Sequence, residues 1–182
     1  MGRLAAAVLG LVLCAGVGST ARADSVALPA VMAVTLQKHD AGTFYVHGAI
    51  EGFGELELLV DTGASYLVIN EKILGVLKQQ GAAEYSRELR GTMADGTSRQ
   101  IPVYRISALR LGTQCWIPNV EAAVFPGTAR PILGMNVLTR LAPFTFSAEP
   151  PQLGLAQCQP DIASAGATAE EAAVEQKVSA RK

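Results

Sequence analysis

The stretch Asp61–Ser65, with the sequence Asp-Thr-Gly-Ala-Ser, constrains the fold more than any other part of the chain. Mainly apolar runs lie on both sides of it, at residues 56–60 and 66–69. An apolar run of this length is typical of a strand covered on both faces. Gly63 permits a sharp turn and a close ligand because it has no Cβ atom, and the Thr62 hydroxyl can hydrogen-bond across that turn. Asp61 is therefore a candidate catalytic carboxylate at the end of a buried strand.

Length and composition favour a single globular domain. The chain has 182 residues, of which 49% are hydrophobic and 17% charged, so it can bury a substantial core. Its formal net charge is −1. Such a balance gives no electrostatic case for binding nucleic acid or an anionic membrane surface.

The first 23 residues are predicted to be a secretory signal peptide rather than part of the fold. Arg3 precedes an apolar run over residues 4–18, and Ala21-Arg22-Ala23 fits a small-x-small cleavage site. Cleavage after Ala23 would place the protein in the periplasm or outside the cell. The alternative is an uncleaved membrane anchor, although the apolar run is short for a membrane span of roughly 20 residues.

The rest of the chain is predicted to be mostly β, with one or two short helices. Asn70 is a candidate N-cap and Gly81 a candidate C-cap for a helix between them. Asp95-Gly96 predicts a projecting hairpin with arms over 86–93 and 97–104, and Pro102 favours an edge position for the second arm. The other predicted strands cover residues 31–36, 43–50, 55–60, 105–111, 115–125, 144–146 and 152–155.

A second informative stretch is Ile132-Leu133-Gly134-Met135-Asn136-Val137-Leu138, in which two apolar residues lead into a glycine and a short helix. The domain is expected to occupy residues 24–158. The polar, alanine-rich segment 159–182 is predicted to be a disordered or marginally helical tail.

Cys115 and Cys158 are the two cysteines that remain after signal cleavage. In an oxidising compartment they can form a disulfide. They can equally be two separate thiols, because the sequence does not give the distance between them.

The order of these features resembles the retropepsin-like aspartic proteases, including single-domain bacterial members exported from the cytoplasm. The resemblance covers about residues 31–155 and rests on Asp61–Ser65 and on Ile132, Leu133 and Gly134. It implies a partly closed β-barrel that forms a two-fold homodimer, with Asp61 catalytic and Thr62, Gly63, Ala64 and Ser65 supporting the loop. The stretch around Ile132–Gly134 would support that loop from beside it.

The resemblance also implies how a substrate would be bound and cut. An extended polypeptide would lie under a flap formed by Met93, Ala94, Asp95, Gly96 and Thr97, where Asp95 serves as a turn residue. One chain carries a single Asp-Thr-Gly, so the second carboxylate would come from Asp61 of a second copy. The predicted function is an aspartic endopeptidase that needs no cofactor.

Other functions remain open at this stage. The same fold could be a non-catalytic peptide-binding or dimerisation module, or a protease dedicated to itself or to one partner. No metal site is predicted, because His39 and His47 have no metal-like spacing with each other or with cysteine.

Overall fold

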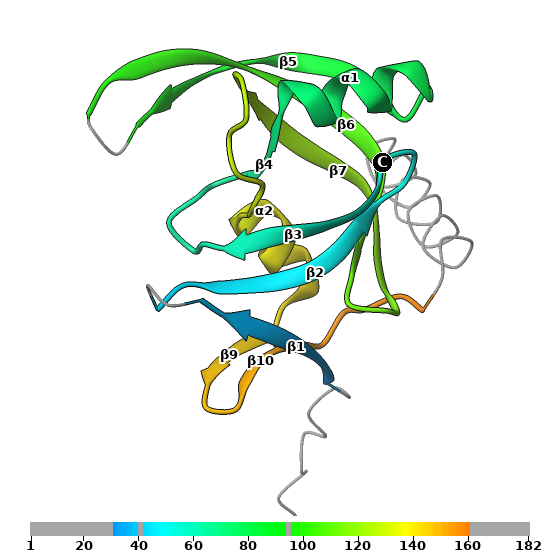
Figure 1. The fold of residues 1–182 in the computed structure, drawn as a ribbon, viewed down its shortest axis with the longest axis vertical. Coiled ribbons are helices and arrows are strands. Elements are labelled where there is room, and N and C mark those ends of the chain that lie inside the picture. Colours follow the sequence, from blue (N-terminus) through cyan, green and yellow to red (C-terminus); the bar gives the residue numbers. More distant parts are fainter. Residues whose placement is uncertain (1–30, 40–41, 94–95, 161–182) are drawn as a thin grey trace, which may run out of the picture.

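The computed structural model describes residues 31–39, 42–93 and 96–160, and the predicted signal peptide lies outside them. The chain is mostly β, as the sequence predicts, with short helices (Figure 1). In chain order the elements are β1 Met32–Lys38, β2 Phe44–Ile50, β3 Gly54–Val60, β4 Leu67–Asn70, α1 Glu71–Gln79, β5 Ala83–Thr92, β6 Ser98–Leu111, β7 Cys115–Phe125, β8 Ile132–Leu133, α2 Met135–Leu138, the 3₁₀ turn η1 Thr139–Leu141, β9 Phe144–Ala148 and β10 Pro151–Leu155.

The strands form one continuous sheet that closes on itself as a barrel. Its order is β5-β6-β7-β4-β8-β3-β2-β1-β10-β9, and an additional pairing joins β6 to β2. That pairing closes a ring of six strands, namely β6, β7, β4, β8, β3 and β2. The predicted partly closed barrel is thus fully closed, while β1, β10 and β9 extend the sheet beyond it.

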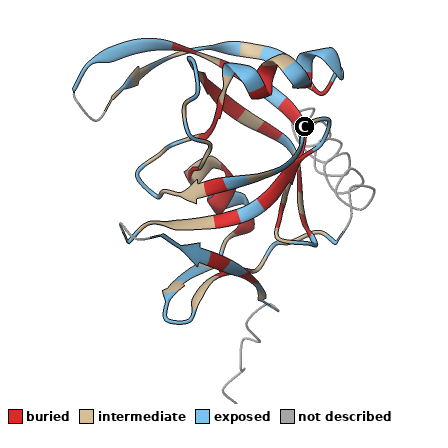
Figure 2. Ribbon diagram, in the orientation of Figure 1, coloured by how far each residue is buried: buried red, intermediate tan, exposed pale blue. Residues whose placement is uncertain are grey.

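The hydrophobic core fills the inside of this barrel. Fully buried side chains come from strands far apart in sequence, such as Leu58 on β3, Val103 on β6 and Leu133 on β8. Figure 2 shows the buried residues on the barrel strands, whereas the outer part of the β5–β6 hairpin is exposed or half-buried. The prediction that the strand before Asp61 is covered on both faces is wrong. Within β3 only Leu58 is buried, and Glu57 is exposed, because the paired strands β2 and β8 lie beside β3 in the sheet and cover neither of its faces.

The β5–β6 hairpin projects from the barrel, as predicted. Its second arm, however, is one strand, Ser98–Leu111, and not two separate strands divided after Tyr104. The sequence around Tyr104 and Arg105 has no turn residue that would end the strand. On the partner strand the pairing register shifts between Tyr85 and Arg87. Pro102 pairs with β5 on one side, but pairing with β7 begins only at Val103, so Pro102 has a local edge position within an internal strand.

The two α-helices begin at the residues that the sequence indicates. The Asn70 side chain accepts a hydrogen bond from the Ile73 amide, which makes Asn70 the N-cap of α1. Gln80 is the C-cap, and Gly81 follows it with a φ of 67°. The observed cap is thus one residue before the predicted one, and Gly81 has the left-handed conformation that commonly ends helices. Helix α2 begins directly after Gly134.

The C-terminal strands return to the start of the domain, where β10 pairs with β1 and β9. The Sγ atoms of Cys115 and Cys158 are 2.08 Å apart and form a disulfide. Gln159 pairs with Trp116, so ordered contacts continue one residue past the predicted domain end, and the tail beyond residue 160 lies outside the described residues.

None of the helices in the described ranges is long and apolar enough to cross a membrane.

Candidate active site

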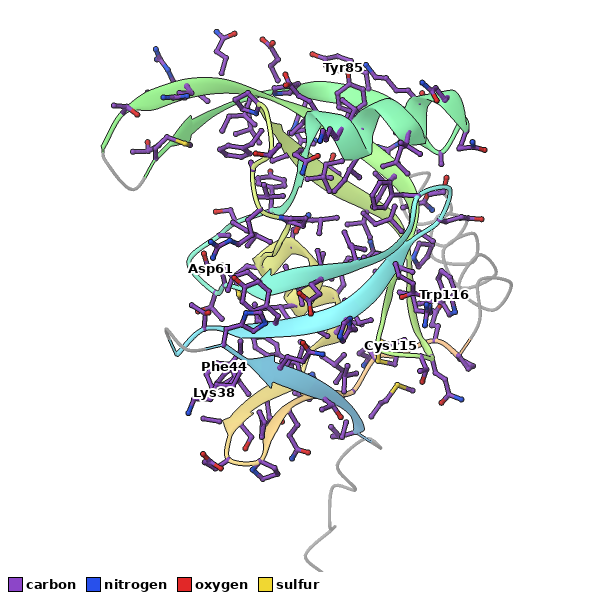
Figure 3. The ribbon with its side chains drawn as sticks, in the orientation of Figure 1. Lys38, Phe44, Asp61, Tyr85, Cys115 and Trp116 are labelled. Atoms are coloured by element: carbon purple, nitrogen blue, oxygen red, sulfur yellow. A yellow bond between two sulfur atoms is a disulfide. The ribbon has the colours of Figure 1, made fainter. Side chains whose placement is uncertain are left out.

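Asp61 lies where β3 ends, at the start of the loop that leads to β4 (Figure 3). The Asp61 amide donates to the Leu133 carbonyl (3.2 Å), which ties the loop to β8. The Gly63 amide donates to Asp61 Oδ1 at 2.8 Å, and the Ala64 amide donates to the Asp61 carbonyl at 3.2 Å. These bonds fix the carboxylate in a tight turn. Asp61 is half-buried, while Thr62 and Gly63 are exposed.

The stretch after β8 packs against this loop, as the resemblance to retropepsin-like proteases implies. The Met135 amide donates to the Ala64 carbonyl (2.8 Å), and the Asn136 amide donates to the Ser65 carbonyl (3.0 Å). The start of α2 therefore satisfies two carbonyl groups of the Asp61 loop. Ile132 and Leu133 add strand pairing with Leu59 and Val60.

The Asp61 loop and the start of α2 pack so closely that position 134 must be glycine. A Cβ atom at this position would lie 2.1 Å from the Tyr66 carbonyl oxygen and 2.8 Å from that of Ala64. Both are backbone atoms of the loop after Asp61, so neither can rotate away. Only glycine lets the two motifs lie this close.

The Asn136 side chain is a supporting group that sequence reasoning missed. Its Oδ1 accepts from the Leu67 amide at 2.7 Å, and its Nδ2 donates to the Glu121 carbonyl at 2.7 Å. Asn136 therefore links the Asp61 loop to β7. The sequence did contain a signal for this role. An amide side chain in an otherwise apolar run is unfavourable when buried unless its polar atoms are hydrogen-bonded.

A cleft of about 580 Å³ lies between the Asp61 loop and the β5–β6 hairpin. Loop residues form one side and hairpin residues the other, and most of the lining is apolar. The lining consists of Gly63, Ala64, Ser65, Tyr66, Val68, Leu89, Arg90, Gly91, Thr92, Met93, Ile101, Ala123, Phe125 and Ile132. The volume suits a few side chains of a peptide.

Three of the predicted flap residues, Met93, Gly96 and Thr97, are described and lie between β5 and β6. Met93 lines the cleft. The Met93 amide donates to the Thr97 carbonyl (2.8 Å), and the Gly96 amide donates to the Met93 carbonyl (2.9 Å). Gly96 has a φ of 80°, a conformation in which glycine is strongly favoured. Ala94 and Asp95 lie outside the described residues.

Two further ionisable side chains stand near the cleft and were not singled out from the sequence. Arg87 on β5 forms an ion pair with Glu121 on β7 and donates a hydrogen bond to the Tyr66 hydroxyl. The hydrogen bond from Arg87 is the main reason that the pKa of Glu121 is lowered from its usual value.

The two histidines are not among the residues that line the cleft. His47 contacts Gln37 and Glu57, and the His39 ring packs against Tyr45. Within residues 31–39, 42–93 and 96–160, no group of three or more His, Cys, Asp or Glu side chains could hold a metal ion.

Comparison with known proteins agrees with this architecture. The family described as gag-polyprotein putative aspartyl protease matches residues 46–140, more than half of the chain. The chain therefore belongs to this family of retropepsin-like aspartic proteases. The matched range includes both the Asp61 loop and the stretch around Gly134.

A solved structure has the same fold. A retropepsin-like aspartic protease from Rickettsia conorii superposes with a TM-score of 0.51 and 19% sequence identity, covering 69% of this chain and 92% of that one. This likeness confirms the predicted retropepsin-like fold. No curated protein matches the chain.

Proposed function

We propose that the protein is an aspartic endopeptidase that works as a homodimer, with Asp61 of each copy in one active site. The observation that carries the proposal is the placement of Asp61. It begins a loop fixed by Leu133 and Gly63. The residues that follow in this loop, from Gly63 onward, form one side of a cleft, and the β5–β6 hairpin forms the other.

The chemistry requires two carboxylates around one water molecule. One, ionised, accepts a proton from the water as it attacks the scissile carbonyl carbon. The other, protonated, donates a hydrogen bond to the carbonyl oxygen. Two carboxyl groups about 3 Å apart share one proton, because placing two negative charges so close is unfavourable.

The second carboxylate comes from a second copy of the chain. Asp61 is the only acidic residue of the Asp61–Ser65 loop, and the described lining of the cleft includes no Asp or Glu. A two-fold axis beside the loop would bring Asp61 of both copies together. Thr62, exposed beside Asp61, would then brace one loop against the other.

The side of the molecule that carries Asp61 is open to such a partner. In Figure 1 the loop between β3 and β4, the end of the β5–β6 hairpin and the β9–β10 turn all lie on the left of the view. Strand β9 ends the sheet and has one unpaired edge, and Phe146 on it is 46% exposed. An unpaired edge with an exposed aromatic side chain is suited to association with another chain.

The substrate of this site would be a polypeptide in an extended conformation. Such a peptide can add to the hairpin as a strand, with its alternate side chains entering the apolar cleft. Closure of the hairpin would exclude water from the carboxylates. We place the enzyme in the periplasm or outside the cell, and the Cys115–Cys158 disulfide supports this because such bonds persist in oxidising compartments.

Cleavage of a mixed peptide library by the full-length chain, from acid to neutral pH, tests the function. Asp61→Asn keeps the shape of the side chain and removes its charge, so it should abolish cleavage with the fold intact. Glu57→Gln is the matched control, because Glu57 is an exposed carboxylate on β3, four residues before Asp61, and its replacement should leave cleavage unchanged. Peptide binding without any cleavage by the wild type would instead indicate a binding module.

A further inference from the structure

We propose that the Arg87–Glu121 ion pair is a clamp that positions the Tyr66 side chain as a wall of the cleft and so determines which peptides are accepted. The proposal rests on the proposed function of the same site. It assigns Arg87 and Glu121 as positioning residues and Tyr66 as a specificity-determining residue.

Arg87 is held by several contacts at once. Its Nη1 pairs with Glu121 Oε1, and its Nη2 donates to Glu121 Oε2 at 2.9 Å. The same Nη2 donates to the Tyr66 hydroxyl at 3.0 Å, and the guanidinium carbon lies 5.9 Å from the centre of the Tyr66 ring. A planar guanidinium suits such a two-point pairing with a carboxylate, whereas a lysine ammonium does not.

Glu121 joins three parts of the site. Its carboxylate accepts from Arg87 and from the Ser86 hydroxyl, both on β5. Its carbonyl accepts from the Asn136 side chain, which also accepts from the Leu67 amide. Through these bonds β7 is connected both to the root of the hairpin and to the residue that follows Tyr66.

Strand geometry explains why a clamp at Arg87 would affect the cleft. Alternate residues of a strand share a face, so Arg87 lies in the same row as Leu89 and Gly91 on β5. Both line the cleft, together with Arg90, Thr92 and Met93 of the same arm. The register shift between Tyr85 and Arg87 sits at the root of this row. Bulges of this kind re-aim the side chains that follow them.

The Tyr66 backbone is fixed independently of its side chain. Its carbonyl is packed against Gly134, and the next amide is bound by Asn136. Within the part of the chain that the structure describes, the one hydrogen bond of the Tyr66 hydroxyl is with Arg87. Loss of the clamp should therefore free the ring inside the cleft without displacing the Asp61 loop.

Partial exposure of the pair makes the test practical. The Arg87 and Glu121 side chains are 43% and 28% exposed, so variants at these positions should fold. The variants are Arg87→Met, which removes the charge, Arg87→Lys, which keeps it, and Tyr66→Phe, which removes only the hydroxyl.

Glu55→Gln is the matched control. Glu55 pairs with Arg110 in another carboxylate–guanidinium pair. It lies near the start of β3, six residues before Asp61, which is about 20 Å along an extended strand.

The experiment measures kcat and KM for peptides that share one scissile bond and differ at one side-chain position at a time. Arg87→Met and Tyr66→Phe should each change the order in which the enzyme prefers the peptides. Both variants should do so at the same side-chain position of the peptide. The change should be about threefold to tenfold in relative kcat/KM, the scale of a partly exposed charge-assisted hydrogen bond, and mainly in KM. Arg87→Lys should not restore the wild-type ranking, and Glu55→Gln should leave it unchanged.

Binding of the same peptides to each variant separates the two proposals. If the wild type cleaves but Arg87→Met ranks the peptides as the wild type does, the clamp is refuted and the protease is not. If the wild type binds peptides selectively without cleaving them, the protease is refuted. The clamp is then supported if Arg87→Met and Tyr66→Phe change the order of peptide affinities, and refuted if they do not. If the wild type neither cleaves nor binds any peptide, both proposals are wrong.

Discussion

Replacing Gly134 with alanine tests how closely the second motif supports the Asp61 loop. The added Cβ atom would lie 2.1 Å from the Tyr66 carbonyl oxygen and 2.5 Å from its carbon. An ordinary contact is at least 3.4 Å, so the backbone of one motif must move by about 1 Å. Overpacking that forces backbone shifts costs about 1–3 kcal/mol, occasionally more, and we expect the upper end because no flexible side chain can yield.

Urea unfolding measures this loss directly. We expect Gly134→Ala to lower the free energy of unfolding by about 3 kcal/mol and the thermal midpoint by roughly 6–12 °C. Peptide cleavage should fall even where the variant is folded, because the loop that carries Asp61 must shift.

Gly75→Ala is the matched control for this substitution. Gly75 lies inside α1, and a Cβ atom there would meet nothing within 4 Å. Alanine is favoured over glycine in a helix, so stability should rise by about 0.5–1 kcal/mol. Equal stability of Gly134→Ala and the wild type would refute the inferred packing.

Three other predictions concern residues that hold the fold and the site together. Reduction of the Cys115–Cys158 disulfide, which joins positions 43 residues apart, should lower the free energy of unfolding by about 4 kcal/mol on the chain-entropy estimate, and an unchanged urea midpoint in reductant would contradict this. Asn136→Ala leaves the Leu67 amide without its partner and should cost roughly 1–3 kcal/mol, measured by urea unfolding and by faster hydrogen exchange at Leu67. Because Arg87 lowers the pKa of Glu121 in the folded state, this carboxylate stabilises the fold fully above the ordinary glutamate pKa of about 4.3 and loses that contribution as the pH falls through the lowered value. The difference in the free energy of unfolding between wild type and Glu121→Gln should therefore shrink in acid. A difference that is constant with pH would refute the stabilising role of the ionised Glu121 carboxylate.

Local sequence signals predicted the elements whose causes are local. Asn70 caps α1 through its own side chain. Asp95-Gly96 predicted the hairpin between β5 and β6. The apolar run before Asp61 predicted a strand, which is β3, but the predicted coverage of both faces is wrong because Glu57 is exposed and only Leu58 in β3 is buried.

Features that depend on contacts between distant parts of the chain could not be predicted from local sequence signals. Closure of the barrel needs β2 to pair with β6, more than fifty residues away. Tyr66, Arg87 and Glu121 stand on separate elements, and no spacing rule joins them. The pairing of Cys115 with Cys158 was left open for the same reason, since it depends on a distance that only the fold determines.

The most direct test of the central claim is to add Asp61→Asn chain to a fixed amount of wild type while peptide cleavage is measured. The shared-aspartate account predicts that cleavage falls progressively toward zero, because mixed dimers hold only one carboxylate. Adding Glu57→Gln chain should cause no such fall. Cleavage that is unchanged by excess Asp61→Asn in a sample shown to exchange subunits would mean that each chain works alone, which would contradict the account.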